Sequence, residues 1–292
     1  MSVLRIVSYN IHKGRSATGS RESFEDLRLG LYGLQPDLLF LQEVQGRNEQ
    51  RISLDAQHES LGAALAMNVA YGCNAVRNQT DHGNALLSRF PILHYENEDI
   101  SDHRLEQRGL LHALVNVQGR PVHCLVVHLG LFAGGRSRQI AALVDRIQRL
   151  VPLDEPMLIA GDFNDWNNRL APMFVSQLGL YEVFSIAPFA ESGPRLLRAP
   201  IAHLRQRMKR GALAQRKEAA PHVRSRQAIE LGVGGGGRLT PPPRTFPAAF
   251  PWLRLDRIYQ RGFAVRKARV LQGLPWRQIS DHAPLFAELE LP

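Results

Sequence analysis

Short apolar runs of strand length constrain the fold of this chain more than any other feature of its sequence. Limited polarity over so few residues is typical of strands in sheets that are covered on a face. The runs alternate with segments of helical periodicity, and we find no internal repeat. They cover residues 3–7, 38–41, 85–87, 110–117, 122–127, 157–160 and 255–259.

Two of the intervening segments have the periodicity of amphipathic helices. Apolar residues recur at three- and four-residue steps through residues 137–150, and we expect Ser137 to cap this helix at its N-terminus. A second helix is expected over residues 23–34, with Leu27 and Leu31 on its apolar face.

Five short polar motifs follow one another along the chain, and four of them close an apolar run. Polar groups at strand ends point toward catalysis, because a rigid sheet can hold them while adjacent loops admit substrate. Since the motifs extend from residue 10 to residue 282, both ends of the chain must contribute to one site, which favours a single domain over residues 1–292. In chain order they are Ser8-Tyr9-Asn10-Ile11-His12, Leu41-Gln42-Glu43-Val44, Val127-His128-Leu129, Gly161-Asp162-Phe163-Asn164 and Ser280-Asp281-His282-Ala283-Pro284.

The composition excludes several classes of protein. With 44% hydrophobic and 22% charged residues it is ordinary for a soluble globular chain, and no apolar run approaches the roughly 18 residues that span a bilayer. The N-terminus enters a strand-like run without the apolar core of a secretory signal, so we expect a cytoplasmic location. Cys73 and Cys124 are too few for a disulfide scaffold and lack zinc-ligand spacing, and we expect both to be buried.

The excess positive charge of the chain is concentrated in one segment. Residues 195–244 contain 12 Lys and Arg against 2 Asp and Glu, while the rest of the chain contains 24 against 25. We interpret residues 189–247 as a basic, flexible insertion within the domain, because the glycines at 234–237 and the prolines at 241–243 are typical of linkers.

A sharper interpretation of residues 195–244 is an arm that attracts phosphate-rich partners. Ile201, Leu204 and Met208 recur at the spacing of one side of a basic helix, a pattern found in segments that lie on anionic membranes. Release of counter-ions would also favour nucleic acid. Both partners, and with them a peripheral location at the membrane, stay open at this point, and the sequence gives no guide to the oligomeric state.

The polar motifs supply the groups that hydrolysis of a phosphodiester requires. Negative oxygens repel an incoming nucleophile, so an enzyme needs a cation, a base for water and a way to stabilise the leaving oxygen. Glu43 follows an apolar run and suits a hard divalent ion such as Mg²⁺, and Asn10 can add an amide oxygen. Asp281 and His282 are adjacent, so on an extended segment they face opposite directions and can serve different roles.

Taken together and in this order, the motifs resemble those of the endonuclease/exonuclease/phosphatase superfamily. Its members include deoxyribonuclease I, exonuclease III-like repair enzymes, inositol polyphosphate 5-phosphatases and neutral sphingomyelinases. The resemblance covers residues 3–185 and 245–290, and it is nearest to small bacterial members with His-Leu-Gly-Leu, Gly-Asp-Phe-Asn-Asp-Trp and Arg-Thr-Phe-Pro segments. Additional matches are Gly83-Asn84-Ala85-Leu86-Leu87-Ser88-Arg89-Phe90-Pro91, Arg108-Gly109, Arg138-Gln139 and Leu255-Asp256-Arg257-Ile258-Tyr259.

The resemblance implies an α+β fold, a four-layer α/β/β/α sandwich of two mixed sheets with the site at the rim where both sheets end. It also implies that Glu43, helped by Asn10, holds Mg²⁺ or Mn²⁺, with Asp281 close to the ion. His282 would be the general base, oriented by Asp256 through the ring nitrogen that it does not use.

The same resemblance assigns the remaining polar residues to the substrate. Asp162 and Asn164 would position water and the phosphate oxygens, while His128 would contact the phosphate and stabilise the leaving group. Arg108 is a further candidate for a phosphate contact. Members of the superfamily differ over one or two ions and over the residue that activates water, so these points stay open.

Each residue also has a structural alternative. Asn10 can be a turn former, Glu43 a solvated carboxylate and His128 a hydrogen-bonded core histidine, while Asp256 can pair with Arg257 or Arg254. The collinear order of several independent motifs favours the functional interpretation.

We therefore expect a metal-dependent hydrolase that cleaves phosphodiester bonds in nucleic acid or a phospholipid head group. The superfamily's repair-type nucleases usually have an aromatic residue and asparagine where this chain has Val127-His128-Leu129, which makes abasic-site repair the weaker alternative. A different class of function is a noncatalytic module that binds nucleic acid or an anionic membrane.

Overall fold

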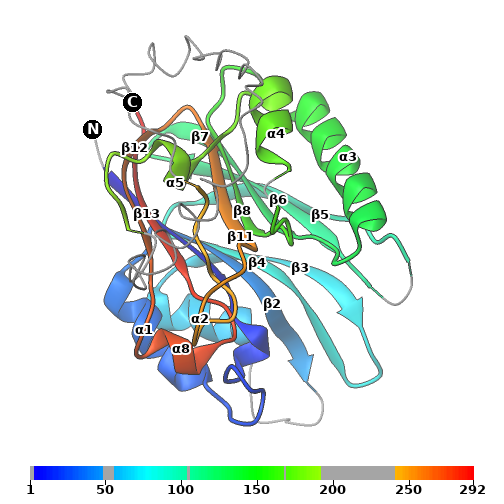
Figure 1. The fold of residues 1–292 in the computed structure, drawn as a ribbon, viewed down its shortest axis with the longest axis vertical. Helices are drawn as coiled ribbons and strands as arrows, with labels where there is room; N and C mark the ends of the chain where they lie inside the picture. The colour runs from blue at the N-terminus through cyan, green and yellow to red at the C-terminus, as the bar shows by residue number, and fades with distance from the viewer. Residues whose placement is uncertain (1–2, 49–55, 104–105, 168, 192–240) are drawn as a thin grey trace, which may run out of the picture.

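The apolar runs of the sequence form central strands of two mixed β-sheets that pack face to face, with helices on their outer faces (Figure 1). The computed structural model describes residues 3–48, 56–103, 106–167, 169–191 and 241–292. The expected α+β, four-layer α/β/β/α architecture is confirmed.

Seven strands of the described residues form the first sheet, and the two ends of the chain meet in it. The N-terminal strand lies between its parallel neighbour and the antiparallel C-terminal strand. In spatial order the strands are β10 (Ala190–Glu191), β12 (Ala264–Val270), β13 (Leu285–Glu290), β1 (Val3–Asn10), β2 (Leu38–Asn48), β4 (Thr80–Ser88) and β3 (Asn68–Val76).

Six strands of the described residues form the second sheet. Its two central strands run parallel, and each has an antiparallel neighbour on its other side. In spatial order the strands are β5 (Ile92–Asp99), β6 (Gly109–Val117), β7 (Arg120–His128), β8 (Met157–Asp162), β11 (Asp256–Arg261) and β9 (Tyr181–Glu182).

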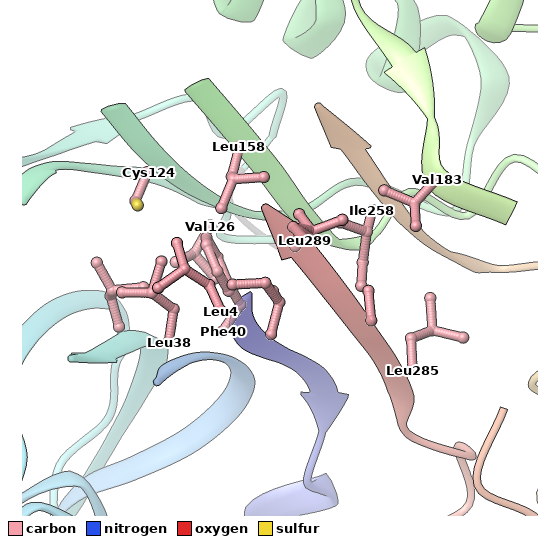
Figure 2. Close-up of a cluster of buried hydrophobic side chains, with 14 of the residues drawn as sticks. Leu4, Leu38, Phe40, Cys124, Val126, Leu158, Val183, Ile258, Leu285 and Leu289 are labelled. Atoms are coloured by element: carbon pink, nitrogen blue, oxygen red, sulfur yellow. The ribbon is translucent and has the colours of Figure 1, made fainter. Parts of the chain in front are cut away.

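Alternate residues of a central strand face different cores. In β2, Leu38 and Phe40 pack between the sheets with Val126 of β7, whereas Leu39 and Leu41 face the helices on the outer side (Figure 2). Each of these fully buried side chains contributes about 1.5–3 kcal/mol to folding. A third core lies between the second sheet and its helices.

The outer helices cover both sheets. The first sheet carries α1 (Phe24–Leu34), α2 (Gln57–Leu65) and α8 (Trp276–Ile279), and the second carries α3 (Ala133–Leu150) and α4 (Ala171–Leu178) (Figure 1). Two further short helical segments are α5 (Val183–Ile186) and the 3-10 turn η1 (His12–Gly14). No helix in the described part of the chain has the length and apolar character needed to cross a bilayer.

Two local predictions are wrong. Ser137 lies inside α3, where its hydroxyl donates to Ala133 O at 2.9 Å, and the helix begins four residues earlier than its periodicity indicated. Cys73 is exposed, because it lies on the solvent-facing side of β3, while Cys124 is buried as expected.

The ends of the 189–247 segment belong to the packed domain. β10 pairs with β12, and Pro242 and Pro243 are buried, contrary to the linker interpretation of residues 241–243. Residues 192–240, including Ile201, Leu204 and Met208, lie outside the described residues, so the flexible insertion stays a prediction.

Candidate active site

Four strand ends and an irregular point within β2 bring five of the expected site residues to one rim. Asn10 ends β1, His128 and Asp162 end the parallel strands β7 and β8, and Asp256 begins β11 opposite Asp162. Glu43 lies in β2 one residue beyond the partner of Asn10. The apolar runs thus position these side chains.

Asn10 connects the two sheets at this rim. Its Nδ2 lies 3.4 Å from Glu43 Oε1 in the first sheet and 3.5 Å from Asp162 Oδ2 in the second. Ser280 anchors the C-terminal motif to the same point, because its hydroxyl donates to Asn10 O at 2.7 Å. Asn10 is therefore buried at a junction and is no simple turn former.

His282 lies between two carboxylates. Its Nδ1 is 2.9 Å from Asp256 Oδ2, and its Nε2 is 3.7 Å from Asp162 Oδ2. All three residues are buried, and one potential ligand atom from each lies within 4.8 Å of the others. Phe246 packs against the imidazole with ring centroids 5.0 Å apart.

The carboxylates control the charge of this histidine. Burial alone would lower the pKa of His282, but Asp256, Asp162 and Asp281 raise it to about 10. His282 therefore carries a proton at neutral pH in this environment. It can act as a base only when another cation compensates the carboxylates.

The carboxylate of Asp256 is incompletely bonded. Asp256 Oδ1 is buried and has no hydrogen-bond partner among the described residues. Neither neighbouring arginine donates to the Asp256 carboxylate: Arg257 donates to the backbone oxygens of Asp256 and Asp165, and Arg254 donates to Pro242 O. The carboxylate instead pairs with His282.

Glu43 has an unusual backbone conformation. It has φ of 53° in the left-handed region, where the pairing register of β2 shifts between Leu41 and Val44. Lys13 Nζ lies 2.8 Å from its Oε2. Burial would raise the pKa of Glu43, but His128, which is charged in acid, and Lys13 hold it well below its usual range, so the carboxylate is ionised at neutral pH.

His128 is neutral at physiological pH. Burial and the charge of Arg108 lower its pKa to about 4, although Asp162 Oδ2 lies 3.7 Å from its Nε2. Lys13 is therefore the cation that opposes the charge of Glu43 at neutral pH. Arg108 is held beside the site by Glu106, whose Oε1 accepts from its Nη2 at 3.3 Å.

Backbone geometry explains the fourth motif. An added Cβ on Gly161, which has φ of 150°, would collide with Val127 O, so only glycine fits where β8 approaches β7. Asn164 has φ of 49°; its backbone N–H donates to Asp162 Oδ1 and its Nδ2 donates to Leu129 O. The turn thus fixes the orientation of the Asp162 carboxylate.

Asp281 is the predicted site residue that the described contacts do not bring into the cluster. Its Oδ1 lies 3.8 Å from His12 Nδ1, and Ser280 Oγ is 3.3 Å from the same oxygen. Asp281 and His282 lie in a bend before β13 and not on an extended segment, and Asp281 is partly exposed while His282 is buried.

These side chains surround a pocket of about 300 Å³. Six predicted site residues line it, together with seven to which the sequence assigned no role. Of these seven, Lys13 and His82 add polar groups, and Trp166, Phe246 and three leucines form apolar walls. The predicted residues are Glu43, Arg108, His128, Asp162, Asn164 and His282, and the three leucines are Leu131, Leu253 and Leu255.

The oxygen donors of this rim fit a hard divalent ion. Glu43, Asn10, Asp162 and Asp256 offer carboxylate and amide oxygens, and the buried, unpaired Asp256 Oδ1 is the kind of atom that a ligand would satisfy. Mg²⁺ or Mn²⁺ suits such a donor set better than a metal that prefers sulfur.

A family model matches residues 7–282 and is described as the Endonuclease/Exonuclease/phosphatase family. The chain belongs to this family. The match includes every residue of the site described above. It also agrees with the resemblance that the polar motifs indicated.

Individual relatives span the whole chain. The Escherichia coli strain K12 protein named Uncharacterized protein YbhP is 34% identical over 98% of this chain and 96% of its own. A solved endonuclease/exonuclease/phosphatase from Beutenbergia cavernae has a TM-score of 0.69 at 18% identity, covering 100% of this chain and 72% of that one. Zebrafish (D. rerio) TDP2, solved in complex with single strand DNA product, has a TM-score of 0.61 at 18% identity, covering 99% and 100%.

Proposed function

We propose that this protein is a divalent-metal-dependent phosphodiesterase in which His282 activates water. The family and the fold are of the phosphoesterase type. The observation that carries the proposal is the buried group of Asp256, His282 and Asp162, which opens into a pocket that also contains Glu43.

Glu43 and Asn10 would hold Mg²⁺ or Mn²⁺, and Asp281 is assigned near the ion by family resemblance alone. When bound, the ion supplies Lewis acidity and positive charge. That charge would compensate the carboxylates that now raise the pKa of His282, and the imidazole could then accept a proton.

Asp256 determines which nitrogen of His282 does the chemistry. With Nδ1 hydrogen-bonded to Asp256 Oδ2, Nε2 is the nitrogen on the side of Asp162. Nε2 is therefore proposed to take the proton of the attacking water. Asp162 and Asn164, fixed by their shared turn, would orient that water and the phosphate oxygens.

His128 and Arg108 would bind the phosphate in different ways. A histidine with a pKa of about 4 is neutral at pH 7, so it can donate a hydrogen bond but is a poor proton donor to a leaving group. His128 would therefore stabilise the leaving oxygen by hydrogen bonding, while Arg108 supplies the positive charge.

The substrate is proposed to be a phosphodiester of nucleic acid or of a phospholipid head group. The TDP2 complex contains single strand DNA product, which favours testing DNA first. Residues 195–244 are proposed to attract either anionic partner. The alternative, a noncatalytic binding module, does not explain the complete set of acidic and histidine side chains at one pocket.

The test is a substrate panel with the purified full chain. Bis(p-nitrophenyl) phosphate, DNA and phospholipid vesicles are each incubated with Mg²⁺, with Mn²⁺ and with EDTA, and His282→Ala serves as the inactive control. We expect metal-dependent cleavage of at least one substrate. Binding of DNA or vesicles without cleavage of any of the three would favour the binding module instead.

A further inference from the structure

Lys13 binds the carboxylate that is proposed to hold the metal. Its Nζ lies 2.8 Å from Glu43 Oε2, and both side chains line the same pocket. The ion pair is partly exposed, with 37% of the Lys13 side chain and 21% of the Glu43 side chain accessible. Exposed ion pairs contribute little to stability, so stability alone does not account for this contact.

Both partners of the ion pair have unfavourable backbone conformations. His12, Lys13 and Gly14 follow one another with φ of 47°, 56° and 68°, and Glu43 has φ of 53°. Residues other than glycine rarely adopt this region, and such positions cluster at functional sites where the surrounding fold holds them.

Gln57 holds the two segments together. Its Nε2 donates to Lys13 O at 2.9 Å, and its Oε1 accepts from the N–H of Gln45, two residues beyond Glu43, at 2.9 Å. Gly14 lies so close that an added Cβ would collide with Gln57 Nε2. The side chain of Gln57 therefore connects the backbone at Lys13 to the backbone next to Glu43.

The ammonium competes with a divalent cation for the same carboxylate. Asn10 Nδ2 approaches Glu43 Oε1 and Lys13 Nζ approaches Oε2, so both oxygens have partners. A cation at Glu43 must displace the ammonium or tolerate a positive charge within a few ångströms, and either effect weakens its binding. Because Lys13 lines the pocket, a displaced ammonium would be within reach of a substrate phosphate there, which would attract it.

We infer that Lys13 is an exchanging counter-ion of the active site. It neutralises Glu43 before the divalent cation binds, and it moves to the substrate phosphate when cation and substrate are both present. The inference rests on the proposed metal site at Glu43. Lys13 would thus set the metal affinity and then contact the substrate directly.

The primary test is Mn²⁺ binding to the full chain, measured by electron paramagnetic resonance of the free ion. Lys13→Met removes the charge with a side chain of similar length, and Lys13→Asn removes it with a residue that tolerates the left-handed backbone. Both variants are expected to bind Mn²⁺ about tenfold more tightly than the wild type, because a competing charge is lost.

Two variants control for charge and location. Lys13→Arg keeps the charge and is expected to retain the wild-type affinity. Arg15→Met removes a charge from the same loop, where Arg15 is exposed and donates to Gly19 O, and no change is expected. In a Glu43→Gln background, Lys13→Met should no longer increase the affinity.

The outcomes separate this inference from the proposed function. Unchanged or weaker Mn²⁺ binding in Lys13→Met and Lys13→Asn would overturn the exchange, because a purely structural ion pair would loosen the site when broken. Absence of saturable Mn²⁺ binding by the wild type would overturn the proposed metal site itself.

A kinetic readout tests the second half of the exchange. At saturating Mn²⁺, Lys13→Met is expected to raise the KM for bis(p-nitrophenyl) phosphate about tenfold with a smaller change in kcat, since a charged contact to the phosphate is lost. An unchanged KM would show that Lys13 does not contact the substrate phosphate.

Discussion

Two buried histidine networks of this protein differ in how completely they are bonded. Behind the second sheet, His112 Nε2 lies 2.9 Å from His123 Nδ1, and His123 Nε2 lies 2.7 Å from Glu155 Oε2. Arg146 of α3 donates to His112 Nδ1, and we refer to His112, His123, Glu155 and Arg146 as the α3 network. Each ring nitrogen therefore has a partner within the fold.

The network at the strand ends is incomplete. His282 Nδ1 is bonded to Asp256, but its Nε2 lies 3.7 Å from Asp162, and Asp256 Oδ1 has no partner among the described residues. Paired histidines and carboxylates therefore do not identify an active site by themselves. Unfilled bonding capacity beside a pocket adds support for a ligand site, because a buried polar group without a partner is costly unless a ligand completes it.

Removal of the metal is expected to have the largest effect on turnover, and this effect depends on the network at the strand ends and not on the α3 network. Dialysis against EDTA is expected to reduce turnover to below about 1% of that with Mg²⁺, since the proposed ion would compensate the carboxylates around His282. Added Mg²⁺ or Mn²⁺ should restore it. Turnover that persists in EDTA at the level seen with Mg²⁺ would contradict the metal dependence.

The second-largest effects on turnover are expected from substitutions of residues that line the pocket. Glu43→Ala and His282→Ala are each expected to lower kcat by at least about 10²-fold while the far-ultraviolet circular dichroism spectrum stays unchanged. The reason is that both groups are proposed to act on the reaction and do not belong to the hydrophobic core clusters. Near wild-type turnover in either variant would remove that residue from the mechanism.

The α3 network should show the opposite pattern. His123→Leu leaves the buried His112 Nε2 without its partner, so we expect a loss of about 1–3 kcal/mol in the free energy of unfolding. Urea denaturation measures this loss. Turnover should stay within about twofold of the wild type, because no contact of His123 reaches the pocket. A large fall in kcat with unchanged stability would erase the distinction between the two networks.

Acid should weaken the α3 network gradually. Burial and the neighbouring His123 lower the pKa of His112 to about 4, below its unfolded value of about 6.5, so the unfolded state binds a proton first as the pH falls. The contribution of His112 to stability is therefore present above about pH 6.5 and is lost between pH 6.5 and 4. His112→Gln should flatten that part of the curve of unfolding free energy against pH, and an unchanged slope would exclude His112 as its source.

The central strands and the main site residues could be predicted because each rests on local sequence. Asn10, His128 and Asp162 close apolar runs, and apolar runs of this length form strands wherever they are buried on both sides. The strand ends then place the polar groups at the rim without any further assumption.

Other features depend on tertiary contacts that no local pattern carries. Lys13 reaches Glu43 only through three successive left-handed residues held by Gln57, and His82 reaches the pocket only through the irregular pairing of β2 with β4. The first turn of α3 contains Gly134 and Gly135, which are poor helix formers, so the sequence pattern does not reveal where this helix begins. Exposed β5 lacks the apolar pattern of the central strands.

The most direct test of the account is anomalous diffraction from a crystal of the full chain soaked in Mn²⁺. The account predicts a Mn²⁺ peak bound by a Glu43 carboxylate oxygen, in the pocket that contains His282. A Mn²⁺ peak elsewhere on the surface, with Glu43 still paired to Lys13, would contradict it.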